Sequence, residues 1–441
     1  LRVGMAIVGA LPVAALVLGS QLGDNPFSQA EILAIVFIVL GMVFSGMSKG
    51  VTGLFYVYEQ AEVPAAMTTV TTILKVALGV GALFLGFGFV GLAAVSIIVN
   101  IITLALLAVL ALRSYPLSGP WTIDWTLQKR LLRKGYPLML IHLLQTIFIS
   151  IDVVILRLML ANGEEVVGWY NSAYKWFNAL QIVPSFFTLA LFPIISRQIQ
   201  SSVDGARRMY QMSLKLMLLL ALPVAAVTAY LATPLVNIVA GAEFLPDGAI
   251  ALQIVILSIP IGWMNSVTNY VLIALGLERM QPRAFTIAVL FNIITNVIFI
   301  PIFTYRAAAV TTILSEVVLL VLFDFYLRQK MDGVKWVAFA GRPLLLTAVM
   351  ALAMWAGGQI HILVGLALGV AIYPAGLWLL RIIGDEERRI LADILPAPIA
   401  ARHKVCRAVP GAGSIPSQWA PWQDAGPQAV GTRKPRVASS R

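Results

Sequence analysis

Stretches of about 20 mostly apolar residues recur from the start of this 441-residue chain to about residue 381, and they limit what it can fold into. A helix needs about 20 such residues to cross a lipid bilayer. Only 12% of the residues are charged, whereas a soluble domain carries about 25%. The chain cannot cover itself with a polar surface, so the sequence predicts an all-α polytopic membrane protein.

The apolar windows predict about twelve membrane spans. They are placed at 3–19, 31–48, 65–85, 89–112, 135–160, 166–195, 209–232, 249–275, 284–302, 306–327, 343–357 and 360–380. Three of them exceed the minimum length for a span, so tilt or kinks are expected. Pro184 and Pro260 are the expected kink points, because proline removes a helix hydrogen bond.

The lysines and arginines between these spans lie almost entirely on one side of the predicted topology. If Arg2 is cytoplasmic, Arg306 is the one basic residue between spans that falls outside. Short loops follow the positive-inside rule, so this bias predicts the orientation and a cytoplasmic C-terminus. The net charge of +11 therefore reflects topology, and no nucleic-acid partner is expected.

Two further patterns argue against metal, disulfide and nucleotide chemistry. Cys406 is the single cysteine, and the three histidines are scattered without ligand spacing. GFGFVG at 86–91 matches the dinucleotide fingerprint, which works only between a strand and a helix. Here it joins two predicted spans, so a tight glycine turn is the better interpretation.

Five charged residues lie inside predicted spans at depths that need an explanation. Lys75, Asp152, Lys175 and Glu316 are the deepest, and charges at such depth usually face a bundle interior or a wet cavity. One alternative is that each acid pairs with a basic residue on a neighbouring helix and only holds the bundle together. Arg157 is nearer the outer end of its helix, where snorkelling to the headgroups is an equal alternative.

The chain resembles the polysaccharide-transport, or Wzx-like, flippases of the multidrug/oligosaccharidyl-lipid/polysaccharide (MOP) exporter superfamily in three stretches. These are LFLGFGFVGLAAVSIIVN (83–100), SIDVVILRLMLANGEEVVGWYNSAYKWFNALQIVPSFFTLALFPIISR (150–197) and AAAVTTILSEVVLL (307–320). The resemblance covers residues 1–381, and the order and spacing of the stretches are more specific than any one of them.

This resemblance implies two inward-facing lobes around a central cavity, in a family that usually has fourteen spans. The expected parts are an N-terminal lobe (1–112) of four helices, an inter-lobe cytoplasmic loop (113–134), a C-terminal lobe (135–327), two extra helices (328–381) and a cytoplasmic, disordered tail (382–441). The inter-lobe loop follows four spans instead of six, so the first two helices of the family pattern are expected to be absent.

The resemblance also implies a function in the bacterial inner membrane: a flippase that carries undecaprenyl-linked oligosaccharide units outward by alternating access. Lipid-linked sugars carry phosphate, so the expected substrate-binding residues are Lys75, Arg157, Lys175 and Tyr174. Asp152 and Glu316 are expected to couple transport to a proton or sodium gradient. No catalytic residue, metal site or cofactor is expected; the expected partners are the lipid-linked oligosaccharide, the bilayer, a polysaccharide polymerase and chain-length proteins.

Three other functions remain open at this point. The first is a multidrug or lipid II exporter of the same superfamily, and only the loose match of the motifs separates this alternative from the expected flippase. A membrane glycan polymerase or ligase usually needs a large outer loop with catalytic groups, but the largest outer segment, 233–249, has only Glu243 and Asp247. A membrane scaffold without transport would tolerate neutral residues at all of the deep charged positions.

Overall fold

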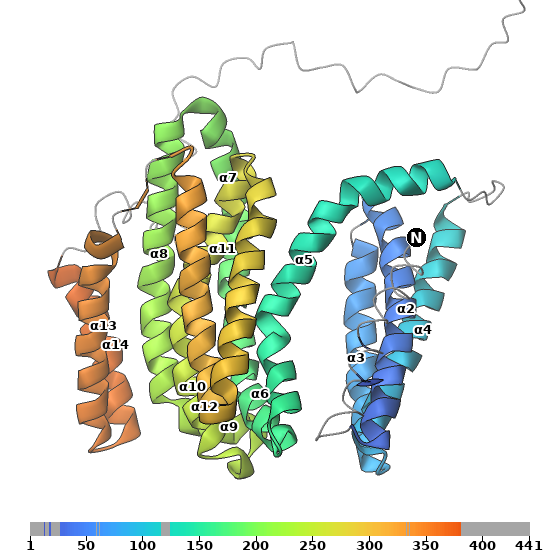
Figure 1. Cartoon of the computed structure of the whole chain (residues 1–441), viewed down its shortest axis with the longest axis horizontal. Helices are drawn as coiled ribbons and strands as arrows, with labels where there is room; N and C mark the ends of the chain where they lie inside the picture. The colour runs from blue at the N-terminus through green and yellow to red at the C-terminus, as the bar shows by residue number, and fades with distance from the viewer. Residues whose placement is uncertain are drawn as a thin grey trace, which may run out of the picture. The chain divides into compact units, whose positions relative to one another are not determined.

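The structure, a computed structural model, describes residues 27–380 except 59, 61, 116–123, 332 and 335, together with residues 13, 17 and 18 (Figure 1). All but three residues of the predicted span 3–19 lie outside the described residues. The predicted tail 382–441, which contains Cys406, lies entirely outside them. Residues 116–123 of the predicted loop 113–134 also lie outside them.

The described residues form helices, with no strand among them. The helices are α2 (Gln29–Val57), α3 (Glu62–Phe84), α4 (Gly88–Ser114), α5 (Trp125–Met159), α6 (Gly163–Leu180), α7 (Ile182–Ser201), α8 (Val203–Tyr230), α9 (Ala232–Ala240), α10 (Asp247–Val255), α11 (Ile259–Ala274), α12 (Gln281–Leu327), α13 (Trp336–Gly358) and α14 (Ile362–Leu379). Short 3-10 turns lie at Ala242–Phe244, Ile256–Ser258 and Glu278–Met280.

Ten helical segments of the described residues are long and apolar enough to cross a membrane, which confirms the polytopic all-α class. One of them, Glu278–Leu327, contains both of the predicted spans 284–302 and 306–327. Thr304 separates them, because its backbone is non-helical at φ 55° and breaks α12 into two halves. The predicted and observed spans therefore agree over the described residues.

The two predicted kinks occur within a few residues of the prolines that suggested them. α6 ends and α7 begins at Gln181, shortly before Pro184. A 3-10 turn at Ile256–Ser258 separates α10 from α11, directly before Pro260. The breaks lie on the N-terminal side of each proline, where the ring crowds the preceding turn.

Helix α5 begins earlier than the span predicted at 135–160. It starts at Trp125, where the Asp124 side chain accepts hydrogen bonds from the backbone nitrogens of Thr126 and Leu127. An aspartate in this position satisfies backbone donors that have no partner inside the helix. The basic run that the sequence places in a loop is therefore an extension of the helix, and apolar length alone could not find it.

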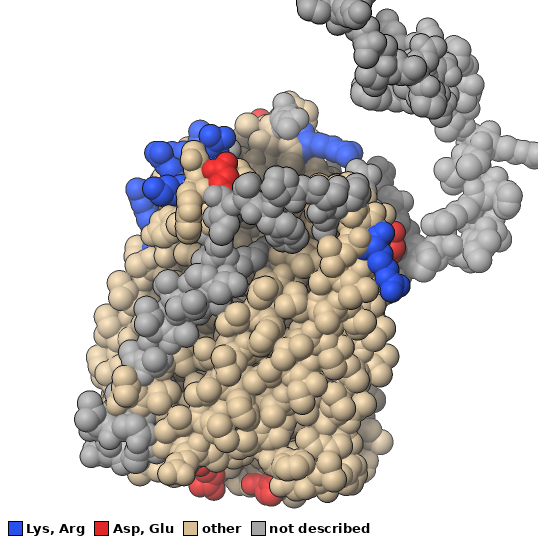
Figure 2. Space-filling view, turned by 90° about the vertical axis from the view of Figure 1, so that its right-hand side faces the viewer, with Lys and Arg blue, Asp and Glu red and all other residues tan. Residues whose placement is uncertain are grey.

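Charged side chains lie at the two ends of the face of the molecule shown in Figure 2. Lysine and arginine side chains gather in the upper part of this view, together with a few acidic side chains, and the charged side chains at the bottom are all acidic; the tan surface between them is uncharged. An uncharged belt bounded by charge at both ends is the surface that a bilayer requires. The cationic top agrees with the predicted cytoplasmic side.

Helices α2, α3 and α4 pack on one another and form the first bundle. Phe55, Leu107 and Ala111 are buried in its core. The Asn100 amide donates a hydrogen bond to the Gly41 carbonyl oxygen at 3.1 Å, which joins α4 to α2. An amide on a membrane helix finds such a partner because lipid offers none.

Helices α5 to α12 share one large core and form the main bundle, with Trp263, Tyr210 and Phe323 fully buried. The α13–α14 hairpin packs against α8 of this bundle. The Tyr373 hydroxyl donates to the Leu219 carbonyl oxygen at 2.8 Å and fixes α14 to α8. Within the main bundle α5 packs against α6 and α12, and this packing places the polar side chains described below.

The glycine turn predicted at 86–91 joins α3 to α4. Gly86 and Gly88 have φ angles of 82° and 56°, which L side chains rarely adopt. A Cβ atom on Gly91 would clash with the Phe87 Cβ atom. The three glycines therefore serve a tight reversal of the chain and not a nucleotide.

Alanine at Gly86 or Gly88 is expected to lower the free energy of unfolding by about 1 kcal/mol, because a positive φ is strained for any residue with a Cβ atom. Gly81 is the matched control, since it lies in the α3 helix and a Cβ there meets nothing within 4 Å. Thermal unfolding in detergent should show lower midpoints for Gly86→Ala and Gly88→Ala, and an equal or higher midpoint for Gly81→Ala. Midpoints that rise for all three variants would contradict the assignment of strain.

Candidate functional site

The Asp152 carboxylate lies in the interior of the main bundle, with 2% of the residue exposed. Its Oδ2 atom accepts hydrogen bonds from the Tyr170 hydroxyl at 2.6 Å and the Tyr174 hydroxyl at 3.2 Å, and its Oδ1 atom accepts from the Val153 backbone nitrogen at 2.9 Å. Both phenols come from α6, one helical turn apart. Within the described part of the chain Asp152 has no ion-pair partner, so neutral donors hold this buried carboxylate.

Further polar side chains lie in the interior on the two halves of α12. The Thr312 hydroxyl lies 3.5 Å from the Tyr170 hydroxyl. The Asn292 amide donates to the Ser315 hydroxyl at 3.1 Å, and the Asn296 amide donates to the Asn292 Oδ1 atom at 2.9 Å. Asn296 is fully buried, and its Oδ1 atom accepts no hydrogen bond from the described residues. The interior thus offers oxygen atoms to a proton or a small hard cation.

Glu316 occupies a second polar position, between α11 and α12. Its Oε2 atom accepts a hydrogen bond from the Asn265 amide at 2.6 Å, and the same amide donates to the Glu316 carbonyl oxygen at 2.9 Å. Gly262 leaves room for the carboxylate, since a Cβ on this residue would lie 3.4 Å from the Glu316 Oε1 atom. No basic side chain pairs with Glu316 among the described residues. The alternative in which both deep acids pair with basic residues is therefore wrong for this region.

Lys175 lies on an exposed polar line of helix α6. Asn171, Lys175 and Asn178 are exposed and follow one another at intervals of four and three residues, so they share one face of the helix. The neighbouring face, with Tyr170, Tyr174 and Phe177, is buried. A polar line that is exposed in the middle of a membrane span requires water or a polar ligand rather than lipid.

Lys75 is exposed on helix α3 of the first bundle. Thr68 and Thr72 are also exposed and lie on the same side of the helix, seven and three residues before it. Within the residues described, neither Lys75 nor Lys175 has a hydrogen bond or ion pair. The two lysines do not contact the carboxylates of Asp152 or Glu316, so the deep charges form separate features rather than one cluster.

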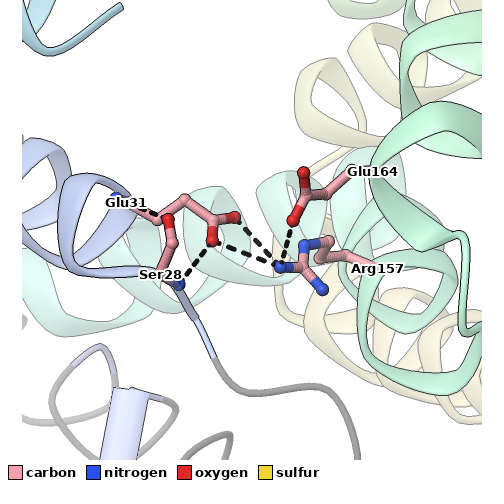
Figure 3. A network of polar contacts seen from close by, with 4 residues as sticks. All are labelled: Ser28, Glu31, Arg157 and Glu164. Atoms are coloured by element: carbon pink, nitrogen blue, oxygen red, sulfur yellow. Dashed lines mark hydrogen bonds and ion pairs between the residues drawn. The ribbon is translucent and has the colours of Figure 1, made fainter.

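Arg157 makes an ion-pair network at the end of α5 (Figure 3). Its Nη2 atom lies 3.1 Å from the Glu31 Oε1 atom and 2.8 Å from the Glu164 Oε1 atom. The guanidinium carbon lies 5.1 Å from the centre of the Phe27 ring. Arg157 therefore has protein partners, and neither snorkelling nor a free substrate-binding position describes it in this structure.

Tyr174, the fourth residue predicted to bind substrate, is 7% exposed and bonded to Asp152. Its ring packs against Tyr170 and Phe177, with ring centres at 4.8 Å and 5.2 Å. A ring enclosed in this way has no face open to a sugar. In this structure Tyr174 contributes to the environment of the carboxylate.

An apolar groove of about 900 Å³ lies between the main bundle and helix α13. α8, α11, the second half of α12 and α13 form its walls. The lining residues include Leu222, Ala225, Met264, Val321, Leu344 and Ala348. Asp324, which pairs with Arg328 at 2.7 Å, is the one acidic residue that lines it. A groove of this size and lining suits a hydrocarbon chain.

Sequence comparison identifies the family. The profile described as "Polysaccharide biosynthesis protein" matches residues 3–250, which is more than half of the chain. The chain belongs to this family. A search of curated proteins gives no match. The resemblance to polysaccharide-transport proteins that the sequence suggested is therefore confirmed at the level of the family.

Solved structures show the fold of this member of the polysaccharide biosynthesis family. A structure titled "Lipid II flippase MurJ, inward closed conformation" is 14% identical, with a TM-score of 0.67, and the alignment covers 86% of this chain and 83% of the other. An inward-facing multidrug resistance MATE transporter of the MOP superfamily is 16% identical, with a TM-score of 0.60 and coverage of 74% and 77%. The family member thus has the fold of MOP-superfamily transporters.

Several polar residues of this family member were not singled out from the sequence. Asn292 and Asn296 lie four residues apart in an apolar span, and such a pair of amides on one helix face is a signal that could have been found. Glu31 completes the capping box of α2 that Ser28 begins, and this pattern is also visible in the sequence. Asn265 gave no such signal, because its role depends on the neighbouring helix.

Proposed function

We propose that the chain is a flippase that carries isoprenoid-linked oligosaccharide units across the bacterial inner membrane for cell-surface polysaccharide, with its C-terminus in the cytoplasm. The observation that carries this proposal is the exposed polar line of α6 with Lys175 at its centre. A lysine in a span without a protein partner among the described residues is suited to an anionic ligand that crosses the membrane. The family to which the chain belongs supports a ligand from polysaccharide synthesis.

The polar head of such a substrate is a phosphate or pyrophosphate that bears sugars. Lys175 and Lys75 supply cations for the phosphate oxygens, and an ammonium group in a site of low dielectric binds phosphate more strongly than in water. Asn171 and Asn178 flank Lys175 and present amide donors and acceptors for sugar hydroxyls. We assign substrate binding to these lysines; Arg157 and Tyr174 are engaged elsewhere in this structure.

The isoprenoid tail requires an apolar path beside the polar one. The groove between the main bundle and α13 supplies it, since nearly all of its lining residues are apolar. A substrate with both a charged head and a hydrocarbon tail uses both features, whereas a small hydrophilic solute would use only one. The groove thus supports a lipid-linked substrate.

Translocation by this route breaks no covalent bond, so the proposed protein is a transporter and not an enzyme. The bundles rock to expose the site to each side in turn. Asp152 and Glu316 are the carboxylates that we assign to coupling with a proton or sodium gradient. A polysaccharide polymerase and chain-length proteins would act on the product on the outer side.

The direct test is translocation in proteoliposomes that contain the purified full chain and a fluorescent isoprenyl-diphosphate oligosaccharide. An impermeant quencher added outside should reveal a rise in the exposed fraction of the lipid that depends on the protein. Liposomes with an equal amount of a Lys75→Gln/Lys175→Gln variant provide the matched control. Export of cationic drugs by the chain, without movement of the lipid-linked sugar, would overturn the proposal in favour of a multidrug exporter.

Filling the apolar groove is expected to slow translocation about tenfold or more without unfolding the protein. Ala348 is exposed on α13 and lines the groove, so Ala348→Trp adds a large ring to it. Val349 is its neighbour, 54% exposed, and is not among the lining residues, so Val349→Trp is the matched control. Equal translocation rates of the two variants would show that the groove does not hold the tail.

A further inference from the structure

One ion pair joins the first bundle to the main bundle among the described residues. Glu31 lies in the first turn of α2, and Arg157 lies in the last turn of α5, 126 positions later in the chain (Figure 3). The Arg157 side chain is 15% exposed and the Glu31 side chain 23% exposed. The pair is therefore partly shielded from water, and the charge bias places it at the outer ends of both helices.

Hydrogen bonds at the start of α2 hold the Glu31 side chain in position independently of Arg157. Its Oε2 atom accepts a hydrogen bond from the Ser28 backbone nitrogen at 2.8 Å, and its own backbone nitrogen donates to the Ser28 hydroxyl at 3.2 Å. This capping box fixes the glutamate at the helix N-terminus. A fixed partner costs less side-chain entropy when the ion pair forms.

Glu164 is the second partner of Arg157, and it belongs to the same bundle as Arg157. The backbone of Gly163 packs so closely against α5 that a Cβ on it would lie 2.7 Å from the Arg157 carbonyl oxygen. The start of α6 and the end of α5 are therefore tightly coupled. The Glu164 side chain is 72% exposed, and its ion pair with Arg157 lies within the main bundle, so this pair involves no residue of the first bundle.

We propose that Arg157, which pairs with both glutamates in this structure, gives up Glu31 and keeps Glu164 when the outer side opens during the transport cycle. The Glu31 contact closes the outer ends of the two bundles. When the bundles part on this side, Arg157 loses Glu31 and keeps Glu164, so a partly buried guanidinium is never left without a carboxylate. This inference rests on the proposed alternating-access function, and it adds the two glutamates as residues that set the balance between the two states.

The test measures opening of the outer side in vesicles of known orientation, independently of any substrate. Cys406→Ser in the full chain gives a cysteine-free background, because Cys406 is the only cysteine. Asn171→Cys then places one reporter on the exposed line of α6. Its rate of reaction with an impermeant maleimide added from outside reports how often this side is open, even if the transported substrate is not the proposed one.

Removing the two glutamates should move the labelling rate in opposite directions. Glu31→Gln should raise it roughly two- to tenfold, because the closed state loses its ion pair. Glu164→Gln should lower it by a similar factor, because the open state then has no partner for Arg157, whereas the closed state still has Glu31. Glu31→Gln in an Arg157→Gln background should add no further increase, since the contact is already gone.

Glu165→Gln is the matched control, because Glu165 is exposed on the same turn as Glu164 and forms no ion pair with Arg157 among the described residues. Its labelling rate should equal that of the parent. An unchanged rate for Glu31→Gln would overturn the closing contact. A change in the same direction for Glu31→Gln and Glu164→Gln would overturn the assignment of Glu164 as the partner that Arg157 keeps in the open state. A reporter that is never labelled before denaturation in any variant would overturn it as well.

Discussion

Translocation of a lipid-linked oligosaccharide is expected to fall to the background of empty liposomes when Lys75 and Lys175 are both replaced by glutamine. Each lysine is exposed within a membrane span and has no partner in the described part of the chain. A charge-assisted hydrogen bond to phosphate contributes about 1.5–3 kcal/mol. Loss of one such bond corresponds to roughly a ten- to hundredfold weaker interaction.

Single substitutions to glutamine and to arginine distinguish the effect of the positive charge from the effect of side-chain packing. Lys75→Gln and Lys175→Gln should each reduce translocation by at least about tenfold. Lys75→Arg and Lys175→Arg keep the positive charge and should retain most of the activity. Lys49→Gln is the control, because Lys49 is also exposed on a helix of the first bundle but lies towards the predicted cytoplasmic end. Full translocation by the double variant, at equal protein amounts, would remove both lysines from the site.

Gradient-driven accumulation of substrate is expected to disappear in Asp152→Asn, while exchange of substrate without a gradient persists. Asparagine keeps the shape of the side chain and can still accept a hydrogen bond from Tyr170. It cannot take up a proton or provide the negative charge that binds a cation. The variant therefore separates movement of the bundles from coupling to the ion gradient.

Accumulation should be measured with imposed proton and sodium gradients in turn, which also identifies the coupling ion. Tyr170→Phe removes the 2.6 Å hydrogen bond and leaves the charge, so it should shift the concentration of the ion that gives half-maximal transport without abolishing coupling. Asp204→Asn, at an exposed position in the first turn of α8, should behave as the parent protein does. Retention of gradient dependence by Asp152→Asn would assign coupling to another group.

The sequence predicts the membrane class and the spans well, because both depend on local apolar length. The breaks near Pro184 and Pro260 also follow from single residues whose effect on a helix is local. The extension of α5 to Trp125 was missed because an interfacial helix with many basic residues has no apolar signal of its own. Interactions between residues close in sequence therefore predict where the helices lie and break, but not which faces of the helices pack against one another.

The candidate site was predicted less completely, since its contacts depend on that packing. Depth in a span draws attention to Asp152, but it could not show that two tyrosines of the next helix bond to it. Arg157 and Glu31 are far apart in sequence, and their contact exists only once two bundles are brought together. Tyr174 shows the same difficulty, because burial on α6 depends on which face of the helix meets the core.

The groove beside α13 has a consequence for what such a carrier can discriminate. Its volume of about 900 Å³ accommodates only part of a long polymeric tail, so the remainder stays dissolved among the acyl chains. Recognition must then concentrate on the first few isoprene units and on the charged end, and carriers with shorter or longer tails should be moved at similar rates.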